Sequence, residues 1–145
     1  MEVEHSTRIL HIDAPPPFLR FVAKYCQSRG IETDSTDSES LGFHYALVKH
    51  YRVILIGAHA PRIDAERILK GLLHAHVTTP VFLLTASLIK DEKLMGQHAN
   101  LVGLISKPLD LKEFSRCIEH ADKLPELAPV ERKKNLSVLV KPKLP

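Results

Sequence analysis

The sequence predicts an α/β domain in which a parallel sheet is covered by helices on both faces. Short apolar segments alternate with amphipathic segments of helical period, at about 20 to 25 residues per unit. The segments 53–56 and 81–84 contain only apolar residues, so they should be strands buried on both sides. Strands and helices that alternate in this way favour a parallel sheet with right-handed crossovers.

The first two strands should flank a helix that begins in a run of prolines. Residues 8–12 have the pattern of a short strand, and the prolines 15–17 fit the first turn of a helix, where a missing N–H costs little. Gly30 is a suitable helix stop, and residues 31–34 form a weak, peripheral strand signal. The buried stripe of this helix should consist of Phe18, Phe21, Val22 and Tyr25.

Four more helices are expected. Asp37 or Ser38 can cap the second, with Leu41, Tyr45 and Val48 on one face. A third helix follows Pro61 and turns Ala65, Ile68, Leu69 and Leu72 inward. Ser87 should cap a weaker fourth helix that runs to about His98 and has few apolar anchors: Leu88, Leu94 and Met95. After a fifth strand at 101–105, Asp110 and Glu113 have capping-box spacing before a final amphipathic helix to about Ala121.

Composition and charge restrict the function. The chain has 145 residues and a formal net charge of +3 from 20 basic and 17 acidic side chains, which are too scattered to indicate nucleic acid. No apolar run is long enough to cross a membrane, and the N-terminus lacks the pattern of a signal peptide, so we expect a cytoplasmic protein.

We expect one domain over residues 6–123, followed by a linker and tail over 124–145. Within the tail, residues 136–140 either are part of a solvated segment or add to a sheet edge or a partner subunit, and a homodimer is possible.

Polar residues and one glycine stand where the predicted strands end. These are Asp13, Gly57, Thr85 and Lys107, and a doubly wound sheet brings the carboxyl ends of its strands to one edge. Ligands of such sheets gather at this edge, so these positions form the candidate site.

Three motifs at this edge resemble those of bacterial response-regulator receiver domains, the chemotaxis-regulator type. They are Ile12-Asp13, Leu84-Thr85-Ala86 and Ser106-Lys107-Pro108, which fall in register over roughly residues 6–123. The resemblance implies a flavodoxin-like, doubly wound, three-layer fold with strand order 2-1-3-4-5 and five helices. It also implies a role in two-component signal transduction.

Departures from the family pattern fall on the residues that would carry its chemistry. In such domains an aspartate after strand three accepts the phosphoryl group, a carboxylate cluster after strand one holds magnesium, and lysine and threonine contact the phosphoryl oxygens. Here Gly57 stands at the acceptor position, Ala14 at the second acidic position and Leu104 at the aromatic switch position. We therefore expect a pseudo-receiver without aspartyl-phosphate chemistry, enzymatic activity, metal or cofactor.

We expect a protein-interaction module whose contact face, as the resemblance implies, comprises helix four, strand five and helix five (88–98 and 101–121). The alternative is a small ligand or anion bound at the emptied phosphorylation pocket. Asp13 and Lys107 either form an ion pair that stabilises the strand ends or belong to such a site. His59 is either solvated or a metal ligand or phosphate acceptor that faces Asp13, and His11 should be a core or sheet-face histidine with one hydrogen-bonded nitrogen.

Overall fold

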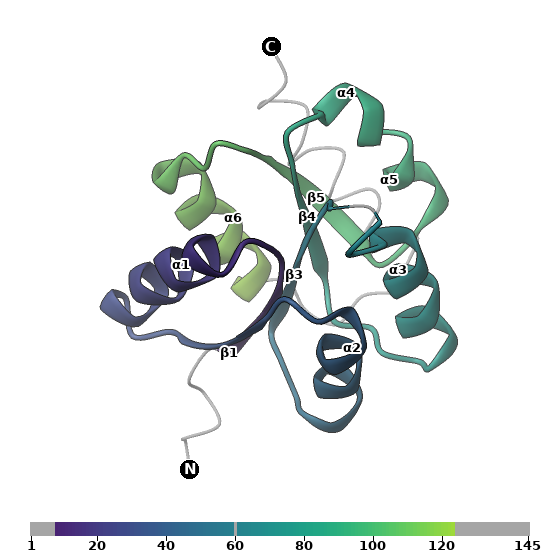
Figure 1. Ribbon diagram of the computed structural model, residues 1–145, viewed down its shortest axis with the longest axis horizontal. Helices are drawn as coiled ribbons and strands as arrows, with labels where there is room; N and C mark the ends of the chain where they lie inside the picture. Colours follow the sequence, from purple (N-terminus) through teal and green to yellow (C-terminus); the bar gives the residue numbers. More distant parts are fainter. Residues whose placement is uncertain (1–7, 60, 124–145) are drawn as a thin grey trace.

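A computed structural model describes residues 8–59 and 61–123 of the chain, and these form a five-stranded parallel sheet (Figure 1). The strand order β2-β1-β3-β4-β5 is the predicted doubly wound topology. Every neighbouring pair of strands is parallel. The strands are β1 (Arg8–Ile12), β2 (Glu32–Thr36), β3 (Val53–Gly57), β4 (Val81–Thr85) and β5 (Leu101–Ser106).

Helices cover both faces of the sheet, which gives the three layers visible in Figure 1. One face packs against α1 and α6, and the other packs against α2, α3 and the two short helices α4 and α5. The helices are α1 (Pro16–Ser28), α2 (Glu39–Val48), α3 (Ala65–His74), α4 (Leu88–Asp91), α5 (Leu94–Gln97) and α6 (Leu111–Lys123).

The central strands explain why this sheet needs two helical layers. Val53 and Leu55 of β3 point into the core on the α1/α6 side, whereas Ile54 and Ile56 point into the core on the α2/α3 side. All four side chains are fully buried. Alternation along a strand therefore sends apolar residues into two cores instead of one core and solvent, as the unbroken apolar segment predicts.

Helix ends follow the local chemistry of the sequence in several places. Gly30 has φ of +77°, in the left-handed region that glycine reaches without cost. The Ser38 hydroxyl accepts a hydrogen bond from Leu41 N, and the Asp110 carboxylate accepts hydrogen bonds from the first turn of α6. The third helix, α3, begins at Ala65, later than the sequence suggests. The Asp64 side chain accepts a hydrogen bond from Arg67 N and so caps the helix at this point.

The predicted fourth helix is instead two single turns, α4 and α5. Neither turn contains a buried residue, and Ser87 stands at the N-terminal cap position without a side-chain capping bond. Its apolar anchors Leu88, Leu94 and Met95 are only partly buried against the core. Too little apolar surface is covered here to hold a longer helix, because most helical stability in proteins comes from packing.

Helix α2 packs with a different face from the predicted one. Gly42 and Ala46 are buried, whereas Leu41 and Val48 are exposed. A Cβ atom at position 42 would overlap the Ile12 side chain, so the helix approaches the sheet most closely through its small residues, while Phe43 and Tyr45 are only partly buried against the core.

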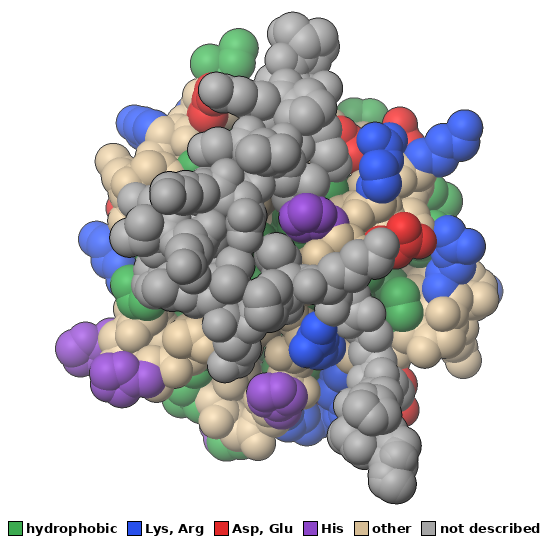
Figure 2. All heavy atoms as spheres, turned by 180° about the vertical axis from the view of Figure 1, so that it is seen from behind, with side chains coloured by type: hydrophobic (Ala, Val, Ile, Leu, Met, Phe, Trp, Pro, Cys, Tyr) green, Lys and Arg blue, Asp and Glu red, His purple; other side chains and the backbone are tan. Residues whose placement is uncertain are grey.

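Charged side chains of both signs are interspersed on the visible described surface in Figure 2. Within residues 8–59 and 61–123, no helix is long and apolar enough to cross a membrane. The charged run 131–134 and the apolar segment 136–140 of the predicted tail lie outside the described residues.

Candidate functional site

The predicted site residues meet at the carboxyl edge of the sheet. Asp13 directly follows β1, Gly57 ends β3, and Lys107 follows β5. Two backbone bonds fix the approach, since Asp13 N donates to Thr36 O of β2 and Lys107 N donates to Thr85 O of β4. The Lys107 side chain then crosses to Asp13, although 94 positions separate them in the sequence.

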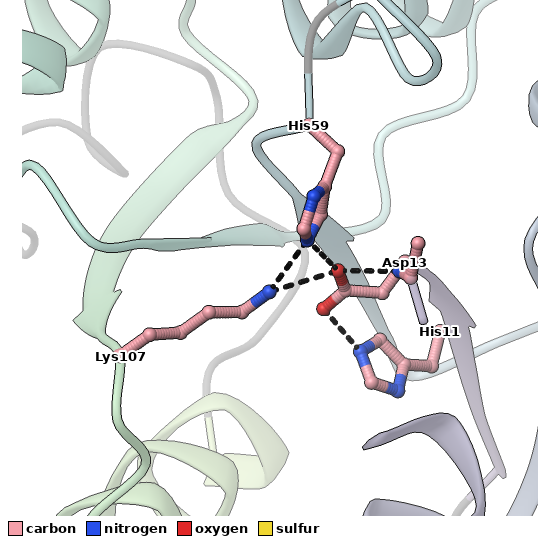
Figure 3. Close-up of polar contacts among 5 residues, drawn as sticks. His11, Asp13, His59 and Lys107 are labelled. Carbon is pink, nitrogen blue, oxygen red and sulfur yellow. Dashed lines mark hydrogen bonds and ion pairs between the residues drawn. The ribbon is translucent and has the colours of Figure 1, made fainter. Parts of the chain in front are cut away.

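Asp13 is the centre of a compact polar cluster (Figure 3). Its Oδ1 lies 2.7 Å from Ala14 N, 2.9 Å from Lys107 Nζ and 3.1 Å from His59 Nε2. Its Oδ2 lies 2.9 Å from His11 Nε2. The side chains of His11, Asp13, His59 and Lys107 are called the Asp13 cluster below.

The electrostatics of the cluster favour an ionised aspartate. Burial alone would raise the pKa of Asp13, because the side chain is fully inaccessible to solvent. The hydrogen bond and the charge of His11, then the hydrogen bonds from Lys107 and Ala14 N, act against burial and leave the pKa below its ordinary value. A carboxylate only accepts, so His11 Nε2 carries the proton that it donates to Oδ2.

Gly57 leaves the space into which Asp13 folds. A Cβ atom at position 57 would overlap the Asp13 carboxylate, and the three nearest heavy atoms all belong to that side chain. The sequence suggests an emptied phosphorylation pocket. At the position above Gly57, however, the Asp13 side chain fills this pocket.

An aromatic ring covers the cluster from the α1 side. The Lys107 ammonium lies 4.7 Å from the centroid of the Phe18 ring, close enough for a cation–π contact. The His11 ring meets the same ring in a T-shaped arrangement at 5.8 Å. Phe18 thus closes the cluster on one side, a role that its place in a helical stripe does not reveal.

The Thr85 hydroxyl bonds to the segment around α4, not to the Asp13 cluster. This hydroxyl donates to Asp91 Oδ2 of α4 at 2.7 Å and accepts from Ser87 N at 2.9 Å. The hydroxyl therefore stabilises the start of α4 and is tied to that segment, not to Lys107.

The other two predicted positions are buried and apolar. Ala14 is 6% exposed and contributes its backbone N–H to Asp13. Leu104 is also 6% exposed and belongs to the core on the α2/α3 side. Neither side chain offers a ligand atom or an aromatic ring.

The residues at this edge do not fit magnesium, the ion that the receiver resemblance implies. Magnesium prefers several oxygen ligands, and Asp13 is the only carboxylate in the Asp13 cluster, with the Lys107 ammonium already bonded to it. Among the described residues, no group of three or more His, Cys, Asp or Glu side chains is arranged to hold a metal ion.

The two histidines of the cluster are partly foreseen in the sequence. His11 is a buried sheet-face residue with one bonded nitrogen, as expected, and its Nδ1 has no partner among the described residues. His59 lies 3.1 Å from Asp13 Oδ1 with 35% of its side chain exposed, and its role as a metal ligand or phosphate acceptor stays a prediction. The contact between His11 and Asp13 could have been predicted from their spacing, because side chains two residues apart lie on the same side of an extended chain.

This fold and edge define the class of protein that the molecule resembles, a response-regulator receiver domain. No model of a known protein family matches the chain. It is 25% identical over 114 residues to the regulatory protein AtoC of Escherichia coli, covering 79% of this chain and 25% of AtoC. It is 27% identical over 107 residues to the transcriptional activator protein IrlR of Burkholderia pseudomallei, covering 74% of this chain and 46% of IrlR.

Solved structures agree with these relatives. The non-phosphorylated HemR receiver domain of Leptospira biflexa superposes with a TM-score of 0.74 at 17% identity, covering 85% of this chain and 99% of that one. The receiver domain of the Francisella response regulator 1452 gives 0.73 at 22% identity, covering 81% and 98%. The chain spans a quarter to a half of the curated relatives it matches but nearly all of these receiver domains, so the comparisons support a receiver-like domain.

Proposed function

We propose that this protein is a signalling module of the receiver type that works through protein contact and without aspartyl-phosphate chemistry. The observation that carries the proposal is the overlap of Asp13 with the space above Gly57. An acceptor carboxylate would have to begin in this space, and the side chain of Asp13 fills it.

The other contacts support the same proposal. Lys107 would neutralise phosphoryl oxygens in a phosphorylated receiver, but here its ammonium pairs with Asp13. Thr85 would move toward the phosphoryl group, but here its hydroxyl is bonded to Asp91. Both groups that would respond to phosphorylation thus have partners from within the chain.

The contact face we propose comprises α4, α5, β5 and α6, the region that the resemblance implies. Its short helices contain no buried residue, and Ile89 of α4 is 90% exposed. A segment that buries so little can reorganise on a partner at small cost in free energy. Capture of a partner by the intact protein and loss of capture on Ile89→Glu would support this assignment.

The alternative, an anion in the phosphorylation pocket, is less well supported by the geometry. An anion would have to displace Asp13 from Lys107 and leave a carboxylate buried without its counter-ion, which is costly.

Phosphorylation is tested by incubating the full chain with acetyl phosphate and magnesium and measuring its intact mass. We expect no added phosphoryl group, while a receiver that has its acceptor aspartate is labelled in parallel. Gly57→Asp should remain unlabelled, because Asp13 occupies the site and Ala14 supplies no metal ligand. Stable labelling of the unmodified chain would overturn the proposal.

A further inference from the structure

We propose that residues 136–140 of this chain dock as an antiparallel sixth strand on the outer edge of β5. Docked there, they would cover part of the proposed contact face, so a partner that uses β5 would have to displace them. The docking stands on the geometry of the sheet, whereas this masking role rests on the proposed function.

The two outer strands of the sheet differ in the protection of their open edges. β2 carries Glu32 and Asp34 and contains no buried residue. β5 (LVGLIS) carries no charge, and its apolar side chains pack into the cores on both faces. Charged residues discourage a further strand from pairing with an edge, and β5 lacks them. Within residues 8–59 and 61–123 no strand pairs with the outer side of β5, so this is the edge that is open to another strand.

The register of β4 and β5 identifies the backbone groups at that edge. Lys107 N donates to Thr85 O, and the direction of the amides alternates along a strand. The N–H of Ile105 therefore also points to β4, whereas the N–H and C=O groups of Leu104 and Ser106 point outward. These are the groups that a sixth strand would pair with.

The chain contains a segment that suits this edge. Residues 136–140 read Leu-Ser-Val-Leu-Val, without a charge, and Pro142 follows where a ladder of hydrogen bonds has to end. A nearly unbroken apolar segment is typical of a strand that is covered on both faces. The position beside β5 offers such a place, between α6 on one face and α4 and α5 on the other.

The length of the chain allows the segment to reach this edge. The 13 residues of α6 span about 20 Å, and the six residues of β5 span about the same distance. Because α6 starts at the carboxyl edge of the sheet, it ends near the amino end of β5. Residues 124–135 can extend about 40 Å, which is enough to return along β5 and bring Leu136 to its carboxyl end.

The direction of the added strand follows from the position of α6. A parallel strand beyond β5 would need a helix on the α3 face to complete a right-handed crossover, as α3 does between β3 and β4. Instead α6 covers the same face as α1 (Figure 1), so this crossover would be left-handed, which parallel strands avoid. An antiparallel strand has no such restriction, and parallel sheets often carry one at their edge.

An apolar hollow lies where the added strand would begin. A cavity of about 690 Å³ is lined by Leu88 and Ile89 of α4 and by Ser106 at the carboxyl end of β5. Ile89 is 90% exposed. In the antiparallel direction Leu136 arrives at this end of β5 and can cover these apolar side chains.

The docking is tested by amide hydrogen exchange and NMR on the full chain. We expect NOE contacts between residues 136–140 and 102–106 in antiparallel order. Val138→Asp places a charge in the middle of the segment and should abolish these contacts. It should also make the outward amides of Leu104 and Ser106 exchange about tenfold faster than in the unmodified chain.

Val130→Asp is the matched control, because it introduces the same charge within residues 124–135. It should leave both amides slow, and the Ile105 amide should stay slow in every variant, which would show that the sheet is intact. Fast exchange of Leu104 and Ser106 in the unmodified chain would overturn the docking. Slow exchange that survives Val138→Asp would also overturn it, as would slow exchange that is lost on dilution, which would indicate a second copy. Phosphoryl labelling would overturn the proposed function and the masking role but not the docking.

Discussion

Two aspartates organise polar clusters in this molecule, and they differ chiefly in their access to water. Asp13 is fully buried and contacts His11, His59 and Lys107 at the carboxyl edge of the sheet. Asp34 lies on the edge strand β2 with 29% of its side chain exposed. Its Oδ2 accepts from Tyr51 Oη at 2.7 Å and Lys49 Nζ at 3.2 Å.

Both carboxyl groups have a lowered pKa, and in both, burial alone would raise it. For Asp34 the Tyr51 and Lys49 hydrogen bonds reverse the effect, and water can replace either partner. Asp13 has no solvent to replace a lost partner. Loss of a partner should therefore be costly at the fully buried Asp13, because the carboxylate would be left buried and unpaired. At the partly exposed Asp34 the loss should cost less, because water can take the partner's place.

The largest effect should come from filling the space beside Asp13. Gly57→Ala should lower the free energy of unfolding by about 3 kcal/mol, because the new Cβ displaces a buried ion pair. Urea unfolding followed by circular dichroism would measure this loss.

In an Asp13→Ala background the same substitution should cost less than about 0.5 kcal/mol, because the overlapping atoms are gone. Gly96→Ala is the matched control, since a Cβ at position 96 meets no atom within 4 Å. Equal costs of Gly57→Ala in both backgrounds would contradict the packing described for Asp13.

A smaller effect is expected at Asp34. Tyr51→Phe removes the hydroxyl that donates to this carboxylate and should destabilise the protein by about 1 kcal/mol. Water can reach Asp34 and replace the lost donor, so a loss as large as that for Gly57→Ala would show that exposure does not separate the two aspartates.

The smallest effect is a difference in pH dependence. A carboxyl group whose folded pKa is lowered adds stability above its unfolded pKa, near 4, and this stability is lost as pH falls through the folded pKa. The urea concentration at the unfolding midpoint should therefore decrease when the pH is lowered below about 4. In this range both aspartates begin to protonate in the unfolded chain. Asp34→Asn should retain part of this dependence, because Asp13 still titrates; a flat profile for this variant would assign the whole effect to Asp34.

The sheet could be predicted because the central strands β3 and β4 carry unbroken apolar segments. The predicted stripe of α1 was wrong in part, since Leu19, Val22 and Cys26 are buried whereas Phe21 is 49% exposed. Where a helix carries a clear stripe, its buried face could be predicted. Helix α3 shows this well, since all four predicted inward residues are buried. The face of α2 could not be predicted, because contact through Gly42 depends on how close Ile12 lies in space. Likewise α4 and α5 differ from the predicted single helix, because weak packing is a property of the assembled core.

For the site, strand ends were enough to bring Asp13, Gly57 and Lys107 to one edge. The motifs did not indicate that the Asp13 side chain fills the space above Gly57, or that Phe18 covers Lys107. Both depend on side-chain directions that no spacing in the sequence encodes. Thr85 shows the same limit, since its hydroxyl lies at the expected edge but is turned toward Asp91.

The space above Gly57 also decides which mutational routes remain open to this protein. An aspartate at position 57 would overlap Asp13, and removing Asp13 first would take the counter-ion from Lys107 and the acceptor from the buried His11. We expect each of these two single steps to give a less stable protein. Under the proposed function, an aspartate at position 57 would therefore require a compensating change at position 13.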